Sequence, residues 1–269
     1  MIKLIIKSDK FYKNIFKLIQ VILPELIGFL GFITIWQILA MHYSSIILPS
    51  PLETLVALKN LATANKLTLA ILTTTLNAIS GFTIATLSGS LLGIIAGIKP
   101  LISRAVRPLI TALQGVPPIA WIVIALLWFG TGNSTSIFTV AVATLPIIFI
   151  GAVEGVRNIN SQLIEMAFTF KIPIKNLLLD LYYPHLLSSL FPSITSGLGL
   201  AWRVAIMSEL LSSETGIGAE MNLARINLDT AEVMAWVVVT VVLILISEYL
   251  VIRPIRRFLE PWNYGEKNK

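Results

Sequence analysis

The chain of 269 residues contains no cysteine and only two histidines, His42 and His185. Without cysteine there is neither a disulfide framework nor a thiolate metal ligand, and histidines 143 positions apart lack the spacing of a metal site. Charged residues are also scarce, at 13% against about 25% in soluble domains. These absences argue against a zinc hydrolase or a redox enzyme, and we assign no catalytic or metal-binding residue.

Hydrophobic residues make up 56% of the chain, more than a water-soluble fold buries. A helix that crosses a bilayer needs about 20 mostly apolar residues. The sequence therefore predicts an all-α, multi-pass membrane protein in which residues 21–252 form a domain of six transmembrane helices. We place these helices at about 21–41, 76–98, 106–129, 136–156, 186–211 and 233–252.

The basic residues predict the orientation, because lysine and arginine favour the cytoplasmic side of short loops. If both termini are cytoplasmic, 16 of the 20 basic residues lie inside: five in 1–20, three in 99–107, three in 157–175 and five in 253–269. The outside holds Lys59, Lys66 and Arg225, and Arg203 lies within a span. The net charge of +6 therefore reports orientation, and we expect no nucleic-acid partner. We expect residues 1–20 to lie on the inner surface and 253–269 to form a basic cytoplasmic tail.

Several local patterns predict details of the bundle. Pro51, with Ser50 as its cap, indicates a short external helix, although a loop on the membrane surface is the alternative. Small residues recur at every fourth position from Gly81 to Gly97 and from Ser189 to Ala205, which favours close packing within the chain. Prolines are expected to interrupt the third and fourth spans, at Pro117-Pro118 and Pro146.

The longest internal hydrophilic connection, residues 157–180, contains a short helical pattern from Ser161 to Phe168, with Ser161 able to cap it. Such a helix either packs on its own bundle or presents a knob to a soluble partner. This segment resembles the membrane permeases of bacterial ABC importers, whose signature is Glu-Ala-Ala, three residues, Gly, nine residues and Ile-x-Leu-Pro. The matching positions are Glu165, Met166, Ala167, Lys171 and, at the end, Leu181-Tyr182-Tyr183-Pro184.

Two departures from the signature stand out. Met166 replaces an alanine, and Lys171 replaces the glycine that gives the turn its backbone freedom. The resemblance nevertheless extends from about Leu48 to Trp262 and is greatest to the nitrate/sulfonate/taurine branch. It is carried by Leu48–Pro51, Gly115–Trp121, Trp128–Gly130, Ser196–Trp202, Ser208–Leu211, Gly216–Gly218 and Pro261-Trp262.

The resemblance implies a type I ABC-importer fold in the bacterial cytoplasmic membrane. It also implies a homodimer, two cytoplasmic ATPase subunits, and a periplasmic or extracellular solute-binding protein. The chain has no phosphate-binding loop, so we expect no cofactor here and ATP bound by the partner ATPase. The segment 157–180, with Glu165 and Pro184, is then the element that couples the ATPase to the fifth span.

Three further residues are candidates for the substrate pathway. Arg203 lies within a span, where a charge by default marks a functional site, although a structural partner for a carbonyl or carboxylate is the alternative. Gln114 either contacts the solute or satisfies the backbone broken at Pro117, and we favour the latter. Glu209 is expected near the outer gate or mouth.

The leading hypothesis is the translocation subunit of an ATP-driven importer for a small anionic solute such as nitrate, a sulfonate or taurine. The first alternative is an importer of a neutral or cationic organic solute, such as a thiamine-precursor-like heterocycle. A secondary transporter or channel is a weaker alternative, because the sequence shows neither paired broken helices nor a chain of membrane carboxylates. A membrane enzyme would need paired carboxylates or a His/Cys cluster in its spans, and none is present.

Overall fold

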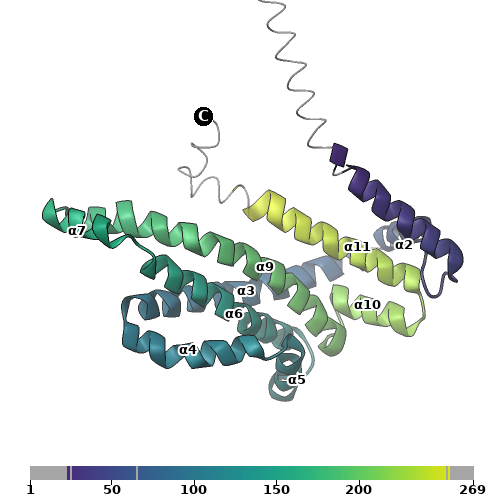
Figure 1. Cartoon of the computed structure of the whole chain (residues 1–269). Coiled ribbons are helices and arrows are strands. Elements are labelled where there is room, and N and C mark those ends of the chain that lie inside the picture. The colour runs from purple at the N-terminus through teal and green to yellow at the C-terminus, as the bar shows by residue number, and fades with distance from the viewer. Residues whose placement is uncertain (1–22, 25, 65, 253, 255–269) are drawn as a thin grey trace, which may run out of the picture.

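The computed structural model describes every residue except 1–22, 25, 65, 253 and 255–269. All regular elements in the described residues are helical, which confirms the all-α prediction (Figure 1). Beside an apolar helix over Leu26–His42, they are α2 (Pro51–Thr63), α3 (Lys66–Ile98), α4 (Pro100–Gly115), α5 (Pro118–Phe129), α6 (Asn133–Arg157), α7 (Ser161–Thr169), α8 (Ile174–Asn176), the π-helical turn η1 (Leu177–Tyr182), α9 (Tyr183–Ser212), α10 (Ile217–Ile226), α11 (Thr230–Ile246) and the π-helical turn η2 (Ser247–Ile252).

Four helices in the described residues are long and apolar enough to cross a membrane. They are α3, α6, the continuous helix Ile174–Ser212 that joins α8, η1 and α9, and Thr230–Leu250. The bent pair α4 and α5 adds a fifth if it is counted as one span. The helix Leu26–His42 covers most of the first predicted span but is shorter, so the count of six stays a prediction. The predicted terminal segments 1–20 and, apart from Pro254, 253–269 lie outside the described residues.

The interruption predicted at Pro117-Pro118 is confirmed. The axes of α4 and α5 differ by 97°, so residues 106–129 do not form one straight helix. Val116 and Pro117 both have extended backbones, with ψ of 123° and 142°. The cause is local, because a residue that precedes proline is driven out of the helical region, and here two such residues follow each other.

The interruption predicted at Pro146 is wrong, because α6 runs unbroken from Asn133 to Arg157. Proline removes one helical hydrogen bond, but α6 lies between α3 and α9 and is the most enclosed of the four long apolar helices. Over half of its most apolar window is buried, against 17% for the helix Thr230–Leu250. Packing on both sides therefore stabilises the helix, which continues through Pro146.

The small-residue stripes pack within the subunit, as expected. A methyl group on Gly93 would lie 2.6 Å from both the carbonyl oxygen of Phe149 and Cβ of Ala152 in α6. In the second stripe, Gly197 faces Ile148 of α6, and Ser193 closely faces Gly151 of the same helix. These contacts let α3 and α9 approach α6 at backbone distance and form the centre of the bundle.

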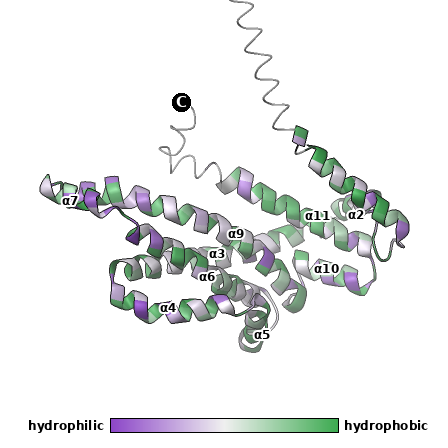
Figure 2. Ribbon diagram, viewed as in Figure 1, coloured by the Kyte–Doolittle hydropathy of each residue, from purple (hydrophilic) through white to green (hydrophobic). Residues whose placement is uncertain are grey.

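The bundle has two distinct ends (Figure 1). The short helix α7 lies at one end, and α2 and α10 lie at the other. The short helix predicted from Pro51 is confirmed as α2, which Ser50 caps together with Glu53 in a reciprocal capping box. Figure 2 shows α11 and the helix Leu26–His42 as mostly hydrophobic. Together with the long exposed apolar side chains of α3, this is the surface expected of a protein immersed in lipid.

Candidate functional site

The helix α7 is a compact knob with a defined start. Its N-cap is Asn160, whose side chain accepts a hydrogen bond of 2.9 Å from the backbone N–H of Gln162. The cap predicted at Ser161 is therefore wrong by one residue. Asn160 has the extended backbone that a cap requires, whereas Ser161 is already the first helical residue.

The end of α7 explains the replacement of the signature glycine. Lys171 has a φ of 51°, in the left-handed region that favours glycine. Its N–H donates to the carbonyl of Phe168, and the N–H of Ile172 donates to the carbonyl of Ala167, both at 3.0 Å. This pair of bonds is the Schellman motif that ends many helices. Lys171 thus keeps the turn that glycine usually makes, at the expense of backbone strain.

The surface of α7 is open in the single subunit. Glu165 is exposed, while Ala167 is 5% exposed and anchors the helix. Met166, Phe168 and Phe170 are 47%, 68% and 74% exposed. Pro184 is half-buried in the first turn of α9, which continues without a break from α8 and η1. The knob is therefore joined through a short turn to one of the long helices of the bundle.

A buried polar cluster occupies the opposite end, around Glu209 of α9. The Glu209 side chain is fully buried, and its Oε2 accepts hydrogen bonds from Oγ1 of Thr74 (2.6 Å) and the N–H of Gly218 (3.2 Å). Its Oε1 accepts from Nδ2 of Asn77 at 2.9 Å. Oγ1 of Thr74 also accepts from the N–H of Ile217 at 2.8 Å.

This cluster acts as the cap of α10. The N-cap residue, Gly216, has no side chain to satisfy the first N–H groups of the helix. Thr74 and Glu209 satisfy them instead, and a carboxylate at a helix N-terminus is favourable for the helix dipole. Gly216 has a φ of 110°, and a methyl group on it would lie 2.5 Å from the Glu209 carboxylate. A side chain at this position would displace the carboxylate, so the position requires glycine.

Glu209 was expected near the outer mouth, and it does lie at the α10 end of α9. Its carboxylate, however, is enclosed within one subunit in this conformation and has no open face toward a pathway. The sequence analysis did not select Thr74 and Asn77. Asn77 could have been recognised from the sequence, because an amide side chain within an apolar span needs hydrogen-bond partners.

Arg203 is exposed on α9, and its Nε donates to the carbonyl of Gly199 at 3.0 Å. A methyl group on Gly199 would meet open space, so this face of α9 is free in the single subunit. Gln114 is exposed in α4 and makes no hydrogen bond to the described residues. It therefore does not satisfy the broken backbone at Pro117 in this conformation. The structure does not bring Arg203, Gln114 and Glu209 together into one site.

These features define a multi-pass helical membrane protein with a capped, exposed helix between two long apolar helices. The chain belongs to the family described as binding-protein-dependent transport system inner membrane component, whose model matches residues 89–263. It is an inner-membrane permease of ABC importers, of the nitrate/sulfonate/taurine branch.

Three curated relatives illustrate the similarity. The chain is 26% identical over 206 residues to the nitrate import permease protein NrtB of Synechococcus elongatus, covering 73% of this chain and 74% of the relative. It is 32% identical to the putative aliphatic sulfonates transport permease protein SsuC of Escherichia coli, over 70% and 72% of the two chains. It is 31% identical to the riboflavin transport system permease protein RibX of Chloroflexus aurantiacus, over 60% of each.

Proposed function

We propose that this permease is the translocation subunit of an ATP-driven importer for a small anionic solute. It works as a homodimer with two cytoplasmic ATPase subunits and receives the solute from an external binding protein. The observation that carries this proposal is α7: an exposed, doubly capped helix that lies at the signature positions and is joined directly to α9. ATP is bound by the partner, because the chain has no phosphate-binding loop.

In this coupling role, α7 inserts into a cleft of the ATPase. Its exposed apolar side chains, Met166, Phe168 and Phe170, need a partner to cover them, and Glu165 supplies a charge on the same short helix. Closure of the ATPase then moves α7, and the continuous helix Ile174–Ser212 transmits the movement into the membrane. Such transmission requires a bundle with two states whose balance the partner biases.

The test is co-purification of the ATPase with Glu165→Lys. We expect this variant to insert normally and to lose the ATPase, because the charge at the centre of the knob is reversed. Asp180→Lys is the matched control, since Asp180 is an exposed carboxylate of the same inner segment but lies outside α7. Normal ATPase recovery with Glu165→Lys would contradict the coupling role.

The exposed arginine supports both the dimer and the anionic solute. A charge that faces lipid hydrocarbon costs about 2.5–3.5 kcal/mol even on insertion scales. Arg203 is exposed in the single subunit, so a second subunit or a water-filled path is the favourable environment for this face of α9. A homodimer whose solute pathway runs along α9 supplies both the second subunit and the water-filled path. In such a dimer each subunit contributes one guanidinium group to the binding of the anion.

Uptake by Arg203→Gln tests the solute class. In proteoliposomes that contain the permease, its ATPase and its binding protein, we expect uptake of nitrate or ethanesulfonate to fall about 10-fold or more, because a hydrogen bond to a charged group is worth about 1.5–3 kcal/mol. The control is Arg225→Gln, an exposed arginine in α10. Unchanged anion uptake would assign Arg203 a structural role.

The name of the relative RibX supports the alternative of a neutral organic solute, since riboflavin carries no charge at neutral pH. This alternative would be favoured if the importer takes up riboflavin but neither nitrate nor ethanesulfonate, and if Arg203→Gln does not change the uptake of riboflavin.

A further inference from the structure

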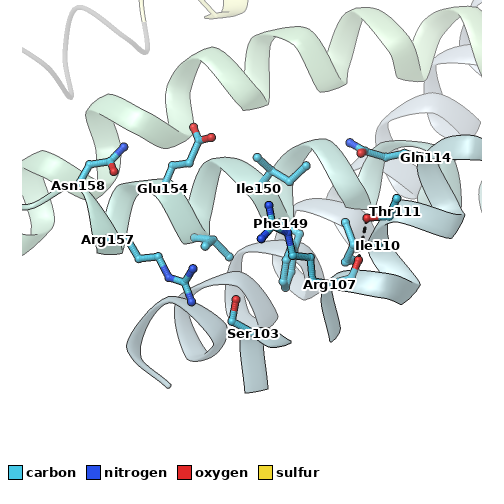
Figure 3. A pocket seen from close by; sticks show the side chains of 11 residues that line it. Ser103, Arg107, Ile110, Thr111, Gln114, Phe149, Ile150, Glu154, Arg157 and Asn158 are labelled. Atoms are coloured by element: carbon cyan, nitrogen blue, oxygen red, sulfur yellow. Dashed lines mark hydrogen bonds between the residues drawn. The ribbon is translucent and has the colours of Figure 1, made fainter. Parts of the chain in front are cut away.

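A cavity of about 350 Å³ lies between α4 and α6 and extends along α4 from Ser103 to Gln114, beside the last turns of α6 (Figure 3). This volume falls within the range of small-molecule pockets, roughly 300–1,000 Å³. Polar side chains from both helices line it, among them Ser103 and Gln114 of α4 and Asn158 directly after α6. The cavity is separate from α7, from the Glu209 cluster and from the Arg203 face.

Two arginines enter this cavity from opposite walls, Arg107 from α4 and Arg157 from α6 (Figure 3). Within the described part of the chain, the Arg107 guanidinium has no hydrogen bond or ion pair. Arg157 makes one long hydrogen bond, 3.4 Å from Nη2 to the carbonyl of Ala96. Glu154 also lines the cavity, but it pairs with neither arginine, since the ion pair found among the described residues joins Lys66 and Glu220. Two guanidinium groups with free donors line one cavity and supply the positive charge and the N–H donors that an oxyanion needs.

The surroundings favour an amphiphile over a free ion. A shallow groove of about 590 Å³ adjoins the cavity and shares Arg107 and Thr111 with it. It continues along α4 over Pro108 and Ala112. The same helix exposes Leu101 and Leu109, at 79% and 65%. A polar, positively charged pocket thus passes into an apolar helix face, which is the layout that a headgroup followed by an acyl chain requires.

The predicted depth of the cavity in the membrane also favours a phospholipid headgroup. On the orientation that the basic residues indicate, the start of α4 and the end of α6 lie at the cytoplasmic surface. Anionic headgroups of the inner leaflet lie at that level, and basic pockets between transmembrane helices on that side suit them.

We propose that the cavity of Arg107 and Arg157 binds the phosphate group of an anionic phospholipid of the inner leaflet, with an acyl chain along α4. Ser103 lies one turn before Arg107 on α4 and contributes a hydroxyl at the same end of the cavity, whereas Gln114 lies two turns beyond Arg107. The proposal is independent of the transported solute, because it concerns a binding step that needs neither ATP nor the partner subunits.

The test is retention of phosphatidylglycerol by the full chain in nanodiscs of phosphatidylcholine with a minor fraction of phosphatidylglycerol, measured by native mass spectrometry. Each basic residue near an anionic surface contributes about 1 kcal/mol, or roughly a fivefold change in affinity. We therefore expect R107Q/R157Q to weaken phosphatidylglycerol retention about 25-fold. R107K/R157K keeps both charges and is expected to retain most of the lipid. Lys99→Gln is the control, because Lys99 is an exposed basic residue at the start of the same helix that does not line the cavity; it is expected to lose no more than the roughly fivefold that one surface charge contributes.

Equal retention by R107Q/R157Q and the wild type would overturn the proposal. So would loss of the lipid in R107K/R157K to the level of R107Q/R157Q, since the charge would then not be what binds. Displacement of phosphatidylglycerol by excess inorganic phosphate or nitrate would also overturn it, because the cavity would then be a site for soluble anions. Failure of anion transport would leave this result unaffected, so the two proposals fail separately.

Discussion

The substitution Thr74→Val tests whether the buried cluster holds α10 in place. Valine has nearly the shape of threonine, so the packing of α3 against α9 and α10 is kept and only the hydroxyl is removed. That hydroxyl makes two hydrogen bonds, one donated to Oε2 of Glu209 and one accepted from the N–H of Ile217. Both are buried, so water does not replace them.

The magnitude follows from these two bonds. A hydrogen bond to a charged group is worth about 1.5–3 kcal/mol, and a buried N–H left without a partner costs about 1–3 kcal/mol. The remaining acceptor capacity of the carboxylate is partly satisfied by Asn77 and Gly218. We therefore expect Thr74→Val to destabilise the α10 end of the bundle by about 2–4 kcal/mol. Glu209→Ala leaves three donors unpaired and is expected to exceed this value.

Amide hydrogen exchange provides the assay, because it reports local opening. A loss of about 2 kcal/mol accelerates exchange of amides in α10 roughly 25-fold. Amides at the centre of α6 are expected to exchange as in the wild type. Met207→Gln is the control, since Met207 lies on the exposed side of α9 close to Glu209 in sequence. Unchanged exchange of the Ile217 and Gly218 amides in Thr74→Val would refute the idea that this cluster caps α10.

Two further predictions concern the backbone. Lys171→Gly is expected to stabilise segment 157–180 by about 1 kcal/mol, because a left-handed conformation costs a side-chain-bearing residue about 1–2 kcal/mol, and slower limited proteolysis of this segment checks it. Faster proteolysis would show that the turn is not strained. Gly93→Ala is expected to lower the apparent melting temperature, since overpacking costs about 1–3 kcal/mol, whereas Gly31→Ala, which meets open space in the helix Leu26–His42, is expected to raise it slightly. Shifts of the same sign and size would contradict the close packing of α3 on α6.

The sequence predicted correctly those structural features that depend on residues close together in the chain. The capping box at Ser50 depends on residues three positions apart, and the break at Pro117-Pro118 depends on the sterics of adjacent residues, so both could be read from the sequence. The break predicted at Pro146 failed, because the same local rule was opposed by the packing of α3 and α9 along α6. The cap of α7 was displaced by one residue, since asparagine and serine both suit that position.

The candidate site residues also fall into two groups, those that the sequence could identify and those that only the structure brings together. Glu165 and Lys171 were selected by spacing along the chain, and the structure shows the capped helix and turn that they form. Arg107 and Arg157 were counted only as markers of orientation, because nothing in the sequence shows that residues 50 positions apart share a cavity. Glu209 lies near the end of α9 that the sequence predicts to be external, but its partners were not foreseen.

The sequence by itself determined that the protein is a helical membrane permease, and it predicts that its basic residues gather on one side of the membrane. Composition and the spacing of motifs carry that information, since apolar length and charge are properties of single segments. Tertiary structure alone decided that Thr74, Asn77 and Glu209 meet, across 135 and 132 positions, and that Arg107 and Arg157 line one cavity. The packing of α3, α6 and α9 creates these contacts, because a buried polar group requires partners but its own segment does not specify which ones.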